Sequence, residues 1–199
     1  YYGHLKDWSE SKIYLPFELP ERKIKKILFV NHSESRTGAP KVVFEVAKEM
    51  KKYFEVKMVN LENLENINGS MHQEFKENFD VIYPNDLSVY EIILKEKPDL
   101  VYVNTVVSYE YAIIAKELGI PVVFHIHELE SVFNDFFHDN RFLLRSFHKS
   151  ADRFISVSEA THSFLVKKGC DPVDLINAFV SSKEINEKSV QKTLFQVNE

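Results

Sequence analysis

The chain alternates between short apolar runs and longer stretches with helical spacing. Apolar runs typical of buried strands occur in the segments 23–30, 54–59, 79–83, 100–103, 121–126, 152–157 and 173–176. Between them, apolar residues recur every three or four positions, as on one face of a helix. This regular alternation favours a parallel sheet with helices on both faces, because each crossover returns over the sheet. We therefore expect an α/β fold, a Rossmann-like, doubly wound and mostly parallel sheet of about six or seven strands.

The ends of the predicted helices follow from capping and breaking residues. Pro40 suits the first turn of a helix that begins at Gly38, because the N–H that proline lacks would have no partner there. A later helix is expected to be capped by Asp86 and to end before Pro98. Its predicted apolar residues are Leu87, Tyr90, Ile93 and Leu94. Further helices are expected at residues 71–76, 108–118 and 158–168, with a break at residues 138–140 inside the helical stretch 129–149.

Shifts in composition mark the ends of one domain. Residues 1–22 contain aromatic residues and prolines without a clear period, and we expect them to form an N-terminal extension. Residues 23–180 carry the strand–helix pattern, and the polar residues 181–199 are typical of the start of a linker between domains. The chain begins with Tyr1 rather than Met, so we expect it to be part of a longer protein.

Charge and cysteine content narrow the partners and the compartment. The 199 residues are 44% hydrophobic and 28% charged, with a net charge of -5, whereas nucleic-acid binding favours a basic surface. The single cysteine, Cys170, excludes an internal disulfide and favours a reducing compartment. No apolar run approaches the roughly 20 residues of a membrane-spanning helix. We expect a cytoplasmic protein without a nucleic-acid partner.

The first strand–loop–helix unit is a candidate site, since ligands of open α/β sheets bind at the carboxyl ends of the strands. Its loop contains Ser35 and Thr37 next to Gly38 and Ala39. The loop lacks the glycine pattern of a dinucleotide site and the lysine of a phosphate-binding P-loop. Its hydroxyls could hold a phosphate or a sugar hydroxyl, or Thr37 could merely cap the helix. A glycine at position 38 would let a ligand approach the backbone.

His125, His127 and Glu128 give the sharpest chemical signal. Alternate residues of a strand share a face, so the two histidines could point the same way, as metal ligands would. Glu128 would then face away, and we expect no metal. His125 lies inside an apolar strand and is predicted to be a hydrogen-bonded core residue. His127 lies where the strand leaves the sheet, and it is predicted to act as an acid, a base or a group that orients a hydroxyl.

Polar residues also follow other strands. Asn104 and Thr105 end the fourth strand, Ser158 follows the sixth, and Asn177 follows the seventh. Their hydroxyl and amide groups suit a polyhydroxylated ligand, although Ser158 is equally suited to cap a helix.

The phenylalanine-rich stretch 133–147 is more typical of a core than of a binding surface. Basic residues interleave with it, so a membrane-facing or lipid-acceptor surface is the alternative. These residues are Arg141, Arg145, Lys149 and Arg153.

Five segments, taken in their order and spacing, resemble the N-terminal domain of a GT-B glycosyltransferase of the retaining family 4 type. They are residues 27–46, 98–105, 121–128, 151–158 and 174–178. The resemblance implies an enzyme that transfers a sugar from a nucleotide-sugar to an acceptor with retention. It implies no essential metal and no cofactor other than the nucleotide-sugar co-substrate. In this family the N-terminal domain mostly shapes the acceptor site, and a C-terminal domain holds the nucleotide-sugar.

The resemblance also implies roles for residues and partners. Gly38 and its neighbours would approach the donor diphosphate or the acceptor, and His127 would contact the transferred sugar or the acceptor. Glu128 stands where the family often has an acidic residue, so His127 and Glu128 are the candidate catalytic residues. The family loop often has two adjacent glycines, whereas Thr37 precedes Gly38 here. The implied partners are the protein's own C-terminal donor-binding domain and a sugar, glycan or lipid-linked acceptor, and the domain alone is expected to be inactive.

Two other classes fit the same residues. A non-catalytic binding module could keep the fold and lose the chemistry. A flavodoxin-like domain would wrap a flavin phosphate with Ser35, Thr37 and Gly38, although Pro40 stands where such a loop needs a further donor.

Overall fold

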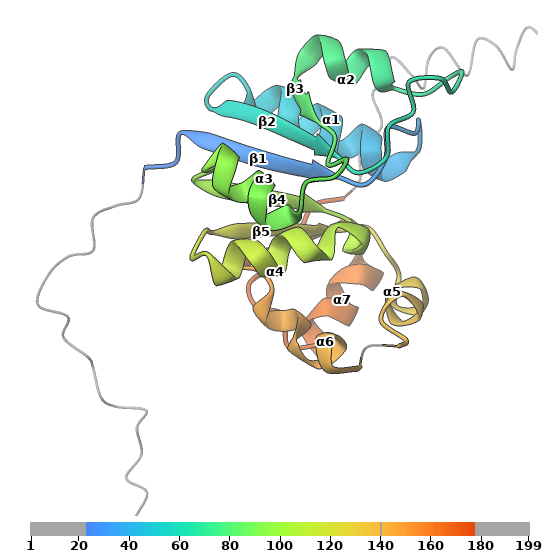
Figure 1. The fold of residues 1–199 in the computed structure, drawn as a ribbon. Coiled ribbons are helices and arrows are strands. Elements are labelled where there is room, and N and C mark those ends of the chain that lie inside the picture. The colour runs from blue at the N-terminus through green and yellow to red at the C-terminus, as the bar shows by residue number, and fades with distance from the viewer. Residues whose placement is uncertain (1–22, 140, 178–199) are drawn as a thin grey trace, which may run out of the picture.

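A seven-stranded parallel sheet forms the centre of the protein (Figure 1). The structure, a computed structural model, describes residues 23–139 and 141–177. The strands are β1 Lys26–Asn31, β2 Glu55–Asn60, β3 Asp80–Ile82, β4 Leu100–Asn104, β5 Val122–Ile126, β6 Arg153–Ser156 and β7 Val173–Leu175. They lie in the order β3-β2-β1-β4-β5-β6-β7, and each neighbouring pair is parallel. The predicted α/β, Rossmann-like fold is confirmed.

Helices connect the strands and cover both faces of the sheet. They are α1 Gly38–Met50, α2 His72–Asn78, α3 Val89–Glu96, α4 Tyr109–Glu117, α5 Glu130–Phe136, α6 Arg141–Ser146 and α7 Glu159–Lys167. Two short 3-10 helices, η2 Val106–Ser108 and η3 Phe147–Lys149, adjoin α4 and α6. Gly119 and Gly169, with φ of 68° and 81°, end α4 and α7 in the left-handed conformation that glycine tolerates best.

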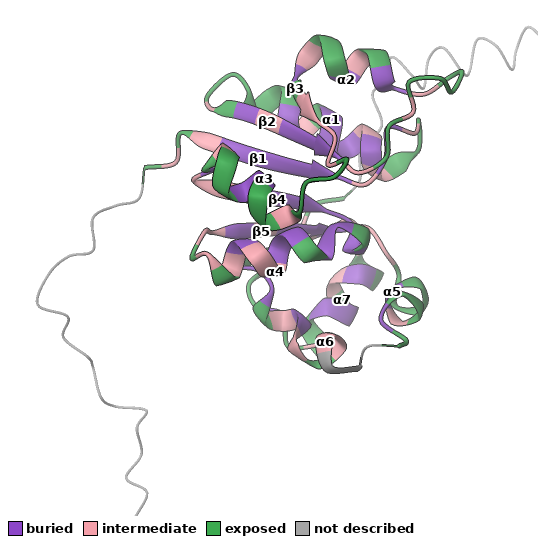
Figure 2. Cartoon of the chain, in the orientation of Figure 1, coloured by how far each residue is buried: buried purple, intermediate pink, exposed green. Residues whose placement is uncertain are grey.

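The strands are buried along most of their length (Figure 2), and their alternate residues divide between two cores. Leu28 and Val30 of β1 face the larger core, which α3, α4, α5 and α7 cover, while Ile27 and Phe29 face a smaller core under α1 and α2. Two-faced burial explains why the strands contain few polar residues. Three phenylalanines of the stretch 133–147 lie in the larger core, which confirms its predicted core role; they are Phe133, Phe137 and Phe147.

The strand order fixes where a ligand can bind. The chain runs from β1 outward to β3, then returns to place β4 on the other side of β1. Loops therefore leave the carboxyl ends of β1 and β4 in opposite directions, and the crevice between them is the usual ligand position in such sheets. The residues that follow β1, β4 and β5 meet at this edge.

The start of α3 differs from the prediction. Ser88, not Asp86, caps the helix: its hydroxyl accepts from the N–H of Glu91, and the Glu91 carboxylate accepts from the N–H of Ser88. This reciprocal pair satisfies two backbone donors, which a lone aspartate could not do. Ile92 and Ile93 of α3 are buried, while three predicted face residues are exposed, namely Leu87, Tyr90 and Leu94.

The predicted extension, residues 1–22, and the predicted linker, residues 181–199, lie outside the described residues. The domain boundaries at residues 23 and 180 remain predictions.

Candidate functional site

Three central strands end in the same pair of residues, a valine followed by an asparagine. Asn31 ends β1, Asn60 ends β2 and Asn104 ends β4. All three asparagines are 0% exposed. A buried amide costs free energy unless it is hydrogen-bonded, and each of these amides bonds to a neighbour. The edge predicted to carry the site therefore rests on a layer of amide groups, of which sequence reasoning identified only Asn104.

Asn104 joins three of the predicted site segments. Its Oδ1 atom accepts a hydrogen bond from His127 Nε2 at 2.9 Å. Its Nδ2 group donates to the carbonyl of Ala39 at 3.3 Å. The end of β5, the start of α1 and the end of β4 therefore meet around one side chain.

His125 and His127 lie side by side and are both kept neutral. Their ring centroids are 4.3 Å apart. His125 is 3% exposed and its Nδ1 atom lies 2.9 Å from the Tyr102 hydroxyl, which confirms the predicted hydrogen-bonded core position. Burial lowers the pKa of His125 to about 3 and that of His127 to about 4, with smaller contributions from His127 and His32 respectively. At neutral pH His127 is an uncharged imidazole.

The residue after β4 adopts a backbone conformation that side chains rarely adopt. Thr105 has φ 68° and ψ 154° and is 3% exposed. Such conformations cost of order 1–3 kcal/mol and persist where the surroundings hold them. The N–H of Thr105 donates to the carbonyl of His125 at 2.9 Å, and its hydroxyl lies 3.3 Å from His32 Nδ1. The turn thus places Thr105 beside His32, a half-buried histidine that sequence reasoning missed.

Glu128 holds the turn after β5. Its two carboxylate oxygens accept from the backbone N–H groups of Val106 at 3.2 Å and His127 at 3.1 Å. Burial raises the pKa of Glu128, and the backbone N–H groups offset only part of this effect. The geometry shows Glu128 fixing His127 relative to η2, and its catalytic role remains a prediction.

The loop between β1 and α1 leaves its glycine in the open. A Cβ atom built on Gly38 would meet no heavy atom within 4 Å, so no packing contact requires glycine here. The hydroxyls of Ser35 and Thr37 lie 2.8 Å apart. Thr37 occupies the N-cap position of α1 but makes no side-chain capping bond. Open space beside a helix N-terminus can admit an anionic or hydroxylated ligand.

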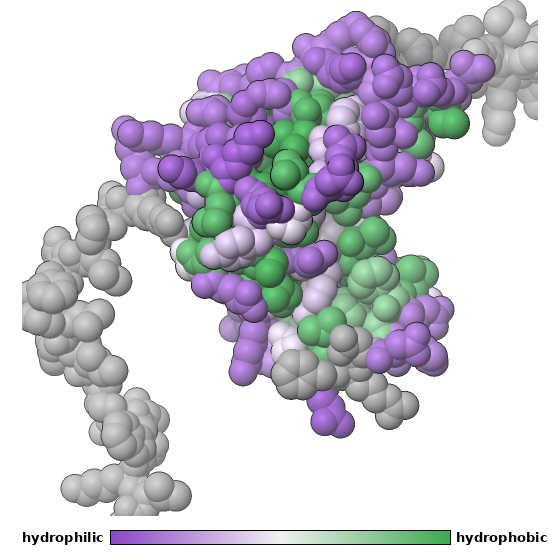
Figure 3. All heavy atoms as spheres, in the orientation of Figure 1, coloured by the Kyte–Doolittle hydropathy of each residue, from purple (hydrophilic) through white to green (hydrophobic). Residues whose placement is uncertain are grey.

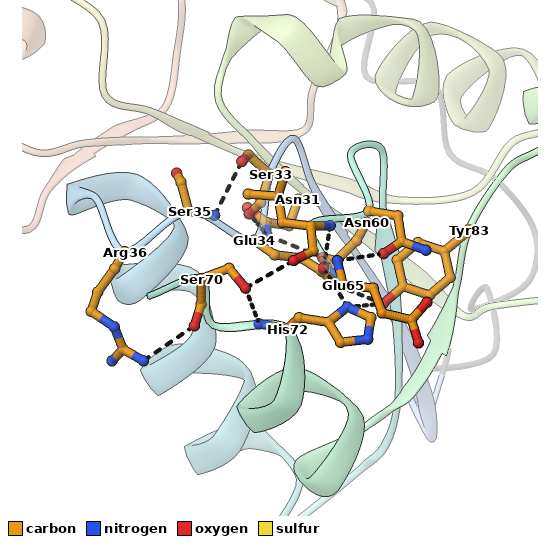
Figure 4. Close-up of polar contacts among 12 residues, drawn as sticks. Asn31, Ser33, Glu34, Ser35, Arg36, Asn60, Glu65, Ser70, His72 and Tyr83 are labelled. Atoms are coloured by element: carbon orange, nitrogen blue, oxygen red, sulfur yellow. Dashed lines mark hydrogen bonds and ion pairs between the residues drawn. The ribbon is translucent and has the colours of Figure 1, made fainter. Parts of the chain in front are cut away.

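Glu34 in the same loop is a fully buried carboxylate that sequence reasoning missed (Figure 4). It accepts hydrogen bonds from Asn60 Nδ2 at 2.7 Å, the N–H of Leu64 at 2.9 Å and the Tyr83 hydroxyl at 2.6 Å, and it lies 2.7 Å from His72 Nδ1. Burial by itself would raise the pKa of Glu34, but these hydrogen bonds together outweigh burial and lower it. Glu34 is therefore ionised and ties together the loops after β1, β2 and β3.

Arg36 fastens the same loops at the surface. Its guanidinium donates to the carbonyls of Gly69 at 3.3 Å and Ser70 at 3.4 Å, and it pairs with Glu74 on α2. The segment after β2 thus forms a wall beside the β1–α1 loop.

The last two predicted site residues follow β6 and β7, and Ser158 reaches the cluster only through Thr161, whose hydroxyl lies 3.1 Å from that of Ser158 and donates to the carbonyl of Glu128 at 3.4 Å. Ser158 caps α7, because its hydroxyl accepts from the N–H of Thr161 at 3.2 Å, so the capping alternative describes its contact. Asn177 is exposed after β7. That strand lies three positions from β4 in the sheet, or about 14 Å at the usual spacing of about 4.8 Å. The structure does not bring Asn177 to Asn104.

In residues 23–139 and 141–177, no three His, Cys, Asp or Glu side chains are grouped so that they could hold a metal ion. None of the helices in these residues combines the length and the apolar character needed to cross a membrane.

A parallel sheet of this order, with polar groups gathered at the carboxyl ends of β1, β4 and β5, defines an open α/β domain of the Rossmann-like class. Residues 36–183, more than half of the chain, match Glycosyltransferase Family 4. The chain belongs to this family, as the resemblance of the five segments predicted. A comparison with curated proteins finds no match.

Several solved structures have the same fold as this chain. HepE from Anabaena, in complex with UDP and glucose, is 19% identical with a TM-score of 0.61, over 85% of this chain and 50% of HepE. MurG from Acinetobacter baumannii is 14% identical with a TM-score of 0.54, over 79% of this chain and 47% of MurG. A putative UDP-N-acetylglucosamine 2-epimerase from Listeria monocytogenes is 14% identical with a TM-score of 0.57, over 76% of this chain and 44% of that protein. The chain thus spans about half the length of these proteins.

Proposed function

We propose that this chain is the acceptor-side domain of an enzyme that transfers a sugar from a nucleotide-sugar to an acceptor with retention. One observation carries the proposal: Asn104 draws His127 and the start of α1 together at the switch point of the sheet. Membership of Glycosyltransferase Family 4 supports it. HepE, which shares the fold, is also known in complex with UDP-glucose, and this supports a nucleotide-sugar as the donor.

The proposed roles follow from the contacts. His127 is neutral and half-buried, so it can hydrogen-bond a sugar hydroxyl at the mouth of the crevice. Thr105 and the hydroxyls of Ser35 and Thr37 supply further hydrogen-bonding groups. The open space at Gly38 would let a diphosphate or an acceptor approach the start of α1. Glu128 would act through His127 by holding its backbone.

The donor would be held by a second domain. The β1–α1 loop has neither the glycine pattern nor the lysine with which a single domain binds a nucleotide. The chain covers 50% of HepE, whose structure contains UDP and glucose. We propose that a C-terminal donor-binding domain closes over the edge, that the nucleotide-sugar serves as co-substrate, and that no metal or other cofactor takes part.

The fold alone does not decide between catalysis and binding. The putative epimerase from Listeria shares the fold with a TM-score of 0.57, so the same framework accompanies another chemistry. A non-catalytic module would need none of the strain at Thr105, where a φ of 68° is held in place beside His32. This strain favours an active site. Family membership argues against the flavodoxin-like alternative.

A transfer assay on the full-length enzyme tests the proposal. With a panel of nucleotide-sugars, we expect release of the nucleotide. We expect His127→Ala to lower kcat/KM about five- to thirtyfold, because a lost hydrogen bond to substrate costs about 1–2 kcal/mol. His138→Ala, at a histidine whose side chain is 77% exposed between α5 and α6, is the matched control and should keep the rate. Unchanged rates for His127→Ala would remove His127 from the mechanism. No release with any donor would favour the binding module.

An apolar surface next to the site suggests the acceptor class. The helix α5 begins two residues after Glu128. Leu129 before it and Val132 and Phe136 within it are between 46% and 54% exposed, and apolar surface is visible in this region (Figure 3). Arg145 and Lys149 are exposed nearby in sequence. An exposed apolar helix face suits a membrane surface, and on α5 it is accompanied by the acidic Glu130 and Asp135. We propose a lipid-linked acceptor, reached by peripheral contact of α5 with the membrane; the cytoplasmic location stays a prediction.

A further inference from the structure

Four fully buried polar side chains form a continuous row beneath the site. Asn104, Asn31, Asn60 and Glu34 are each 0% exposed. They come from the ends of β4, β1 and β2 and from the β1–α1 loop, and consecutive members are hydrogen-bonded (Figure 4 shows the part around Glu34). Apolar residues at these positions would suffice for packing, so the row calls for another explanation.

The orientation of each amide in the row follows from which of its partner atoms can donate a hydrogen bond and which can only accept one. The carboxylate of Glu34 can only accept, so Asn60 must offer it Nδ2, at 2.7 Å. The Oδ1 atom of Asn60 therefore faces Asn31, which must donate through Nδ2, at 3.0 Å. Asn31 then presents Oδ1 to Asn104, which donates through Nδ2 at 3.4 Å. Each amide thus passes the same orientation to the next.

Two backbone carbonyls fix the same orientation independently. Asn31 Nδ2 also donates to the carbonyl of Ser33, and Asn104 Nδ2 also donates to the carbonyl of Ala39 at 3.3 Å. A carbonyl cannot donate, so neither amide can turn over without losing this bond. Asn104 must therefore direct Oδ1 at His127 Nε2, 2.9 Å away, and that nitrogen must carry the proton.

We propose that Asn104, held in orientation by Asn31, Asn60 and Glu34, is a positioning residue that locks His127 in the Nε2–H form and leaves Nδ1 as a hydrogen-bond acceptor.

The consequence is a preference for the ligand group at His127. A neutral ring with its proton on Nε2 has a lone pair on Nδ1, and burial keeps the ring neutral by lowering the pKa of His127 to about 4. Among the described residues, Nδ1 has no hydrogen-bond partner. The group that meets it must donate, as a sugar hydroxyl does and as a phosphate oxygen or a carbonyl does not. This last step rests on the proposed function; the proton position on the ring does not.

Nuclear magnetic resonance of the 199-residue chain tests the proton position without any substrate. Long-range ¹H–¹⁵N correlation distinguishes a protonated ring nitrogen from an unprotonated one, and loss of a signal in His127→Gln assigns the residue. Between pH 6 and 8 we expect one dominant form, with Nε2 protonated and Nδ1 not. A proton on Nδ1, or an average of both forms, would overturn the proposal.

Two variants at position 104 with side chains of similar size distinguish the effect of the Asn104 acceptor oxygen on the His127 proton from an effect of Asn104 on folding. Asn104→Leu removes the acceptor and should release His127 into a mixture of both forms. Asn104→Asp keeps an acceptor oxygen and should retain the Nε2–H form, with the pKa of His127 raised by the new negative charge. A His127 that stays entirely Nε2–H in Asn104→Leu would contradict the proposal. If Asn104→Leu does not fold, the spectrum of the wild-type chain still tests whether His127 carries its proton on Nε2.

Modified donors test the preference for a hydroxyl. In the full-length enzyme, the donor hydroxyl that meets Nδ1 should give an equal loss of kcat/KM when replaced by hydrogen or by fluorine, because neither donates. A fluorinated donor that retains activity where each matching deoxy donor does not would contradict an accepting Nδ1. No transfer with any donor would instead contradict the proposed function. The NMR spectra would still test the position of the proton on His127 independently.

Discussion

At the scale of single residues, Glu34 is the buried charge on which the site loops depend. Removing the charge with Glu34→Gln would leave an amide N–H group facing the donors that now bind the carboxylate. We expect the free energy of unfolding to fall by about 2–4 kcal/mol, since hydrogen bonds to a buried charge are strong and unpaired groups are costly. Chemical denaturation measures this, with Glu45→Gln, at an exposed position on α1, as the control. A loss as small as that of Glu45→Gln would show that Glu34 is dispensable.

The neutral histidines predict a pH dependence of stability. The pKa values of His125 and His127 are lowered to about 3 and about 4 in the folded protein, from an ordinary value of 6.5. Above pH 6.5 neither state binds these protons; below it the unfolded chain binds them first, so stability falls as the pH drops towards the folded values. We expect the free energy of unfolding to decrease between pH 7 and 5. The double variant His125→Leu with His127→Gln should give a flatter curve, and an equally steep curve would contradict this assignment.

At the scale of elements, the start of α3 shows how a cap is chosen. Ser88 and Glu91 satisfy each other's backbone N–H groups, whereas Asp86 lies outside the helix. We expect Ser88→Ala to lower the free energy of unfolding by about 1 kcal/mol, and Asp86→Ala to change it by only a few tenths. Thermal or chemical unfolding of both variants measures the difference. Equal losses, or a larger loss for Asp86→Ala, would contradict Ser88 as the N-cap residue of α3.

At the scale of the whole molecule, the apolar face of α5 predicts vesicle binding. We expect the chain to co-sediment with vesicles that contain anionic lipid, and the double variant Val132→Ser with Phe136→Ser to reduce binding at least about fivefold, because each exposed apolar side chain contributes about 1 kcal/mol on burial in lipid. Leu94→Ser is the matched control, since Leu94 on α3 is 46% exposed, like Phe136. Wild type that stays in the supernatant, or equal losses in the control, would contradict the membrane proposal.

A candidate site residue could be predicted where the local sequence pattern shows that it lies at the end of a strand or the start of a helix. His127, Asn104 and Gly38 could be selected because each ends a strand, directly follows one or begins a helix. Glu34 could not, because a glutamate in a polar loop gives no local sign that it will be buried. A signal for the amide row did exist, in the three strands that each end in valine and asparagine. This pattern predicts contacts between the asparagines only once the order of the strands in the sheet is known.

The sequence by itself determined the elements, the fold class and the family, because periodicity, caps and strand composition are local properties. Only the tertiary structure decided which polar groups meet. Non-consecutive strands β1 and β4 become neighbours through the crossover, and this places Asn104 within reach of Asn31, Ala39 and His127. Hydrogen bonds are short and directional, so they form only after packing sets distances to within a fraction of an ångström. The same packing separates Asn177 from the site and turns Ser158 into a cap.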